Sequence, residues 1–122
     1  MMSYEGLRAW RDCHALALAV YKTTAEFPHH ELYGLISQAR RAAVSAAANI
    51  AEGSATRGPR DYCRFLNIAL RSLSELSYLL LLGKDLEYIS VTAWQELNAL
   101  RDKAGKLTWN LYTSLQKRSP PS

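Results

Sequence analysis

Residues 30–53, HELYGLISQARRAAVSAAANIAEG, decide the fold that we predict for this chain of 122 residues. Apolar residues recur along this stretch at steps of three and four, so they fall on one face of a helix. The stretch is rich in alanine, which favours helix formation and lets a neighbouring helix approach closely. We therefore predict one helix over 30–53, with Gly53 as its C-terminal cap.

Three further segments show the same helical spacing of apolar residues, at about 5–26, 59–83 and 91–117. Phe27-Pro28 ends the first of them, because the residue before a proline is pushed out of the helical region. Pro59 suits the first turn of the third helix. Four helices of matched length joined by short links predict an all-α, antiparallel up-down four-helix bundle.

The bundle is expected to form one domain over residues 1–118, followed by a flexible tail, SPPS, at 119–122. Apolar residues make up 48% of the chain and charged residues 21%, as in globular proteins. The start of the chain has no signal-peptide core, and no apolar run is long enough to span a membrane. The two cysteines lie 50 positions apart. These features predict a cytoplasmic protein with reduced thiols and no membrane partner.

Two stretches are more apolar than a single buried stripe requires. Residues 15–20 and 79–82 are apolar around most of the helix, since consecutive residues lie about 100° apart. A bundle helix usually buries one stripe, so the surplus predicts a second buried face and hence a homo-oligomer. On the first helix, the residues that we expect to face the core of the bundle are Leu7, Trp10, His14, Ala17, Leu18, Tyr21 and Ala25.

The excess positive charge is confined to one segment. The net charge is +4, and residues 40–71 contain six arginines and two acidic residues, while the rest of the chain is balanced. Arginine presents a planar donor fork that suits phosphates and carboxylates. The segment is either a set of solvated helix faces or a surface for an anionic partner, with nucleic acid as the first candidate. The candidate contact residues are Arg40, Arg41, Arg57, Arg60 and Arg64.

No sequence pattern points to an enzyme, a metal site or a cofactor. The Glu-x-x-His spacing of di-iron bundles occurs at Glu26 and His29, where Pro28 interrupts it at the end of a helix. Cys13 and Cys63 lack neighbours that would activate a thiol. Glycine-rich phosphate loops and the nucleophile elbow do not occur. We therefore expect no catalytic residues and no bound metal.

Five polar residues share predicted helix faces. Ser45, Asn49 and Glu52 are spaced four and three apart on the second helix, and Ser72 and Glu75 lie three apart on the third. If these helices are antiparallel neighbours, the two sets could face each other. We interpret them as a hydrogen-bonded network that holds the register of the bundle. The functional alternative is a paired-carboxylate site at Glu52 and Glu75, in which mutual repulsion raises one pKa.

A combination of short motifs carries a resemblance over nearly all of residues 4–115. The motifs are Phe27-Pro28, Glu31-Leu32-Tyr33-Gly34-Leu35, Gln38 with Arg40-Arg41, Ser45, Asn49-Ile50-Ala51-Glu52-Gly53, Phe65, and Ser72 with Glu75-Leu76. With these motifs the chain resembles the bacterial 23S rRNA intervening-sequence proteins, also called the four-helix bundle protein family. The resemblance implies an up-down bundle that assembles into a cyclic homopentamer. It also implies a link to nucleic acid, because members are encoded inside rRNA intervening sequences.

Relatives of that family include accessory proteins of diversity-generating retroelements, which are basic rings that bind nucleic acid and associate with a reverse transcriptase. The resemblance implies no enzymatic activity. It also implies that Asn49, Glu52, Ser72 and Glu75 are structural and that the arginines are the contact residues. A ring would repeat the basic segment in every copy and so strengthen the local field.

Functions of different classes stay open at this point. The first hypothesis is a non-enzymatic basic ring that binds structured RNA or DNA through arginine–phosphate contacts, as an accessory factor, with an affinity that falls steeply with salt. The alternative is a protein-interaction scaffold, in which the same arginines meet an acidic partner protein or pair internally. A third hypothesis is a carboxylate enzyme at Glu52 and Glu75.

Overall fold

The structure is a computed structural model that describes residues 3–118. Within that range the chain forms four α-helices and no strand, so the predicted all-α class is confirmed. The tail expected at 119–122 lies outside the described residues. The helices are α1 (Arg8–Thr24), α2 (Ser37–Ser54), α3 (Pro59–Asp85) and α4 (Val91–Arg118).

Short helical turns precede α1 and α2. A 3₁₀ turn, η1 (Tyr4–Gly6), leads into α1, whereas a 3₁₀ turn, η2 (His29–Glu31), and a π-turn, η3 (Leu32–Ile36), lead into α2. The helix expected over 30–53 is therefore a regular α-helix only from Ser37. Glu31 holds the irregular start, because its carboxylate accepts a hydrogen bond from the backbone N–H of Leu35 at 3.1 Å.

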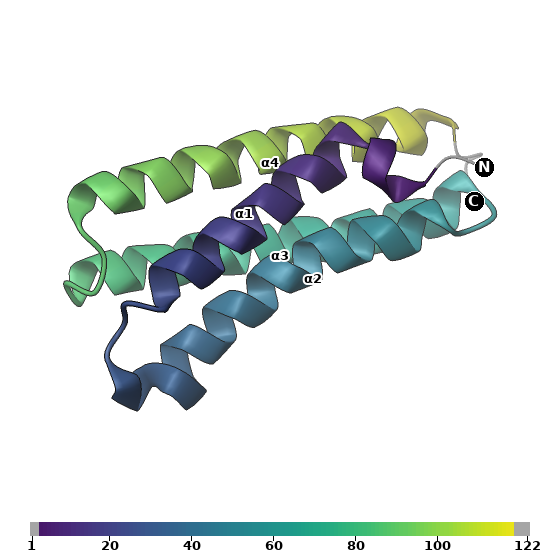
Figure 1. Ribbon diagram of the computed structural model, residues 1–122. Coiled ribbons are helices and arrows are strands. Elements are labelled where there is room, and N and C mark those ends of the chain that lie inside the picture. Colours follow the sequence, from purple (N-terminus) through teal and green to yellow (C-terminus); the bar gives the residue numbers. More distant parts are fainter. Residues whose placement is uncertain (1–2, 119–122) are drawn as a thin grey trace.

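The four helices alternate in direction, as Figure 1 shows. Two contacts set the register of α1 and of α3 against α4 along the bundle axis. The Cys13 sulfur lies 3.8 Å from the Thr108 hydroxyl oxygen, and the Cys63 sulfur lies 3.7 Å from the carbonyl oxygen of Tyr112. The turn η1 and the C-terminal end of α4 lie at the same end of the bundle as the α2–α3 connection, and the other two connections lie at the opposite end (Figure 1).

The buried side of α1 differs from the stripe expected from the sequence. Trp10 is half-buried, and His14, Leu18 and Tyr21 are exposed. The prediction is wrong by one position, or about 100° of rotation. Both faces of this helix are apolar, and the face with more of the small side chains packs against the neighbouring helices. The buried residues are Ala9, Cys13, Leu16, Ala17, Val20 and Thr24.

The buried face of α2 is built mainly from alanine, at positions 39, 42, 43, 46 and 47. Gly53 lies inside α2 rather than beyond its end, so its predicted role as a cap is wrong. A Cβ atom at this position would lie 2.9 Å from the Cβ of Phe65 and 2.9 Å from the Cδ1 of Tyr62. Gly53 therefore permits the close approach of α2 and α3.

The apolar run at 79–82 is mostly used inside the chain. Leu79 and Leu80 are buried, Leu82 is half-buried, and only Leu81 is exposed. Because α3 packs against both α2 and α4, it needs a wide apolar arc. This run therefore gives little support to a second buried face. By length and composition α3 could also cross a membrane, a test that a core helix passes as well.

Candidate functional site

A short polar chain joins α2 to α3 near the middle of their interface. The hydroxyl oxygens of Ser45 and Ser72 lie 2.9 Å apart. The Asn49 side-chain amide donates to the carbonyl oxygen of Ser45 at 2.8 Å and to its hydroxyl oxygen at 3.1 Å. Ser72 is buried, so the contact satisfies a hydroxyl inside the interface. The structure thus brings together three of the five residues expected to form a network.

The two carboxylates of that set lie apart. From the Ser45–Ser72 contact, Glu52 is seven residues toward the α2–α3 connection, and Glu75 is three residues in the opposite direction. At 1.5 Å per residue, about 15 Å separates their levels along the bundle. Both side chains are exposed, and neither forms an ion pair with another described residue. This placement does not provide the close pair that a two-carboxylate site needs.

Arg40 is engaged inside the chain. Its Nε donates to the Thr24 hydroxyl oxygen at 2.9 Å, and its Nη2 donates to the carbonyl oxygen of Tyr21 at 3.3 Å. The guanidinium also lies over the Tyr21 ring, 4.5 Å from the ring centroid. These contacts tie α2 to the C-terminal end of α1 and engage two of the five N–H donors of the Arg40 guanidinium. Sequence spacing gave no sign of them, because the partners lie on another helix.

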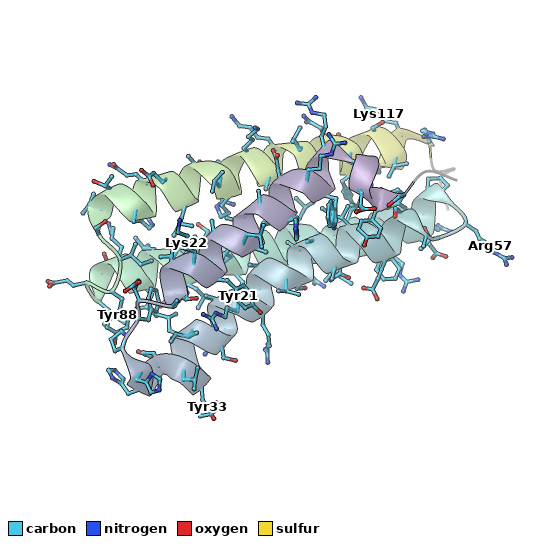
Figure 2. All side chains as sticks on the ribbon, in the orientation of Figure 1. Tyr21, Lys22, Tyr33, Arg57, Tyr88 and Lys117 are labelled. Atoms are coloured by element: carbon cyan, nitrogen blue, oxygen red, sulfur yellow. The ribbon has the colours of Figure 1, made fainter. Side chains whose placement is uncertain are left out.

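The other four candidate arginines are exposed and fall in two places. Arg41 follows Arg40 on α2, whereas Arg57, Arg60 and Arg64 lie at the α2–α3 connection and the start of α3. The Arg64 guanidinium is 3.2 Å from an Asp61 carboxylate oxygen, but such an exposed pair is weak. Figure 2 shows Arg57 extending away from the bundle. The five candidate residues therefore do not form one patch.

Further basic residues gather where Arg57 lies. The contact between Cys63 and Tyr112 places Lys117 and Arg118, five and six residues beyond Tyr112, level with Arg57. Figure 2 shows Arg57 and Lys117 at the same end of the molecule. The first residue of α1, Arg8, lies toward this end as well. We call this surface the basic end, and its members are Arg8, Arg57, Arg60, Arg64, Lys117 and Arg118.

Sequence reasoning missed the basic residues near the two chain ends because it searched for one basic segment. These residues could have been found from the antiparallel topology. That topology brings the start of α1 and the end of α4 next to the α2–α3 connection. Acidic residues are fewer at these levels, namely Glu5, Glu52 and Asp61. Basic side chains thus outnumber acidic ones, and the end carries a net positive charge.

An exposed apolar surface covers the outer sides of α1 and α2. A groove of about 640 Å³ there is lined by Tyr21, Tyr33, Val44 and both Arg40 and Arg41. Tyr33 is 93% exposed, and Leu18, one turn before Tyr21 on α1, is 60% exposed. We call this surface the outer apolar face, and its members are Leu18, Tyr21, Leu32, Tyr33 and Val44.

The nucleophilic and metal-ligating side chains show no concentration at either surface. Burial raises the pKa of the Cys13 thiol from 9.0 to about 11, and burial also raises the pKa of Cys63. Both thiols are therefore protonated at neutral pH. Among residues 3–118, no three His, Cys, Asp or Glu side chains lie close enough together to hold a metal ion.

His14 was expected in the core, and that expectation is wrong. Its side chain is exposed and stacks on the Trp10 ring, with the two ring centroids 4.7 Å apart. Trp10 packs against the edge of the core, so the stacked pair lies at the border between the buried and exposed sides of α1.

Comparisons with known proteins identify relatives of this fold. The family model described as 23S rRNA-intervening sequence protein matches residues 5–110, which confirms the resemblance inferred from the motifs. A crystal structure of a protein of unknown function from the S23 ribosomal protein family of Bacteroides thetaiotaomicron VPI-5482 is similar, with a TM-score of 0.76. The alignment covers 85% of this chain and 97% of that one at 24% identity, and it supports the fold alone. No curated protein matches the chain.

Proposed function

Since the chain belongs to the 23S rRNA-intervening sequence protein family, we propose that it is a non-enzymatic, homo-oligomeric bundle that binds structured RNA or DNA in the cytoplasm. Its contacts would be arginine–phosphate contacts at the basic end. The observation that carries this proposal is the convergence of basic side chains from three separate parts of the chain on one end of the bundle.

The chemistry of the basic end suits a phosphate backbone. Arg57, Arg60 and Arg118 are exposed and form no ion pair with other described residues, so their guanidinium donors are available. An exposed cation gains little from one partner in water, but several cations along one polyanion release counterions together. Binding would therefore depend on salt and would carry little base readout.

Self-association would occur through the outer apolar face. A second copy of this chain is the occupant we propose, because the apolar stretch at 15–20 leaves Leu18 exposed and Tyr33 is almost fully exposed on the same surface. Such a surface on an isolated subunit marks an interface. A cyclic pentamer is the assembly that the sequence resemblance implies. Each added copy would contribute another basic end, which raises the avidity for a long polyanion.

A protein-interaction scaffold is the second candidate. Arg41 and Tyr33 at the groove on the outer apolar face favour it, since arginine and tyrosine are enriched at protein interfaces. In that case an acidic protein, such as a reverse transcriptase with an acidic surface, would take the place of the nucleic acid. Material that copurifies with the protein separates the two candidates, because nuclease removes only a nucleic acid.

Titration of a labelled RNA hairpin at several salt concentrations tests the first candidate. The variant carrying R57A, R60A and R118A should bind more weakly, and the slope of log affinity against log salt should shrink by about 0.7–0.9 for each phosphate that is no longer neutralised. R71A is the matched control, because Arg71 is an exposed arginine of α3 outside the basic end. An affinity independent of salt, or an equal weakening in R71A, would contradict the proposal.

Light scattering tests the assembly separately. Replacing Leu18 and Tyr33 with serine should lower the mass of the particle toward that of one subunit. Tyr78, an exposed aromatic residue of α3 outside the outer apolar face, provides the control Y78S. A wild-type protein that is monomeric at micromolar concentration would remove this part of the proposal.

A further inference from the structure

An open groove of about 490 Å³ runs between α3 and α4, away from the outer apolar face. The contact between Cys63 and Tyr112 sets the register of its walls. Counting along the two antiparallel helices places Asn67 level with Thr108, the residue before Trp109, and Leu70 level with Gly105. Because Gly105 carries no side chain, the middle of the groove stays open. A Cβ atom there would meet only the Arg101 guanidinium, at 3.8 Å.

Trp109 offers an aromatic surface at this groove. Its side chain is 54% exposed. The indole packs edge-to-face against Tyr112, with the ring centroids 5.6 Å apart and an interplanar angle of 69°. That contact braces the ring, so a planar group that stacks on the indole would lose little additional side-chain freedom. An exposed indole of this kind is a platform for a nucleobase.

The groove also holds polar groups without partners in the described chain. Asn67 and Ser74 of α3 form no hydrogen bond to another described residue through their side chains. Leu70 and Leu73 lie between them and supply an apolar floor. An amide and a hydroxyl beside an apolar floor can bond the edge of a base while its ring is buried.

Lys106 supplies the available cation. It lies one helical turn from Trp109 on the same side of α4, is exposed, and forms no ion pair with a described residue. The one carboxylate at the groove, Asp102, already pairs with Arg101. A phosphate next to a stacked base could therefore contact Lys106 with little repulsion from a carboxylate.

A stripe of α3 connects this groove to the basic end. Arg60, Arg64 and Asn67 are spaced four and three apart, so they share one side of the helix. A strand whose phosphates lie on the two arginines would thus be led toward Trp109.

We propose that the α3–α4 groove takes one nucleobase of a single-stranded segment, stacked on Trp109, with a neighbouring phosphate on Lys106. The inference rests on the proposed function, because the basic end supplies most of the affinity. It adds a preference for unpaired over paired nucleic acid, since a base inside a duplex cannot leave its stack without cost.

Fluorescence titrations of the full chain with oligothymidylate, with oligouridylate and with a DNA duplex test this site. W109A should weaken binding of the single strands roughly 5- to 150-fold, whereas W109F should keep most of the affinity and lose the quenching of tryptophan emission. G105L should block the groove while Trp109 stays in place. Y78A is the matched control for loss of an exposed aromatic residue on these two helices. The duplex should bind all these variants alike, and the two oligonucleotides show whether the site prefers RNA or DNA.

The outcomes separate this inference from the proposed function. Unchanged single-strand affinity in both W109A and G105L would overturn the inference, and the proposed function would stand if the arginine variants still lose affinity. If neither set of variants changes binding, both fail. A lower particle mass for W109A in light scattering would assign the groove to a contact between copies of the chain, which overturns the inference as well. W109F and G105L keep the test decisive if W109A fails to fold.

Discussion

The hydroxyl oxygens of Ser45 and Ser72 lie 2.9 Å apart, across the closely packed interface between α2 and α3. S72A should lower the free energy of unfolding by about 1 kcal/mol, because the variant cannot form this buried hydrogen bond. S45A should cost somewhat more, since Asn49 also loses an acceptor. The double variant should cost less than the sum, because both changes remove the same hydrogen bond. Urea unfolding measures all three, and S74A, at an exposed serine of α3, is the control.

Gly53 and Gly58 should respond oppositely to alanine. G53A places a Cβ atom 2.9 Å from atoms of Tyr62 and Phe65, so α2 and α3 must separate, at a cost of about 1–3 kcal/mol. G58A meets no atom within 4 Å and should be neutral or slightly stabilising. Thermal unfolding of the two variants tests this difference. Equal melting temperatures would mean that the close approach of the helices does not depend on Gly53.

Alanine substitutions at the neighbouring residues Arg40 and Arg41 should have different effects on the stability of the fold. R40A removes the hydrogen bonds to Thr24 and Tyr21 and should lower the free energy of unfolding by about 1–2 kcal/mol. R41A removes an exposed side chain and should change it by less than about 0.5 kcal/mol. Denaturant unfolding followed by circular dichroism measures both. A stable R40A that loses nucleic-acid binding would instead make Arg40 a contact residue.

Glu31 should make the stability of the fold depend on pH below about 4.5. Its pKa lies below the ordinary 4.5, because the carboxylate accepts hydrogen bonds from the Leu35 backbone N–H and then from the Tyr88 hydroxyl, at 3.0 Å. Since the folded pKa is depressed, the stabilisation is fully present above pH 4.5 and is lost as the pH falls through the folded value. The melting temperature of the wild type should therefore fall more steeply in that window than that of E31Q.

Y88F checks the assignment of that pKa. Removing the Tyr88 hydroxyl should move the pKa of Glu31 back toward its ordinary value, so the acidic loss of stability should be smaller and should be complete at a higher pH. An NMR titration of the Glu31 carboxyl carbon reads the shift directly. An unchanged pKa would show that the tyrosine does not act on this carboxylate.

The helices were predictable because their apolar spacing, prolines and short links are local features of the sequence. The side of α1 that faces the core could not be predicted. Leu16 and Leu18 lie on two different apolar stripes, and periodicity alone does not tell which stripe is buried. The choice between the two stripes depends on the helix that packs against α1. The stripe that contains Cys13 is buried, and Cys13 contacts the hydroxyl of Thr108 on α4. Periodicity within one helix carries no information about that partner.

The candidate site was predictable only in part, for the same reason. The arginines are evident from the sequence, but their roles are not. Arg40 forms a hydrogen bond to α1, whereas Arg57 extends away from the bundle (Figure 2). Ser45 and Ser72 could be paired from helix spacing, whereas the distance between Glu52 and Glu75 needed the register of α2 against α3. Topology, rather than residue type, sorted the structural residues from the available ones.

The turn η1 and the C-terminal end of α4 lie at the same end of the bundle as the α2–α3 connection, which is the basic end (Figure 1). A fusion partner joined directly before η1 or after α4 would therefore begin beside the surface proposed to meet nucleic acid, and a charged tag there would alter the electrostatic field of that surface. A fluorophore or surface tether would be better attached near Glu87, in the α3–α4 connection at the far end of the molecule.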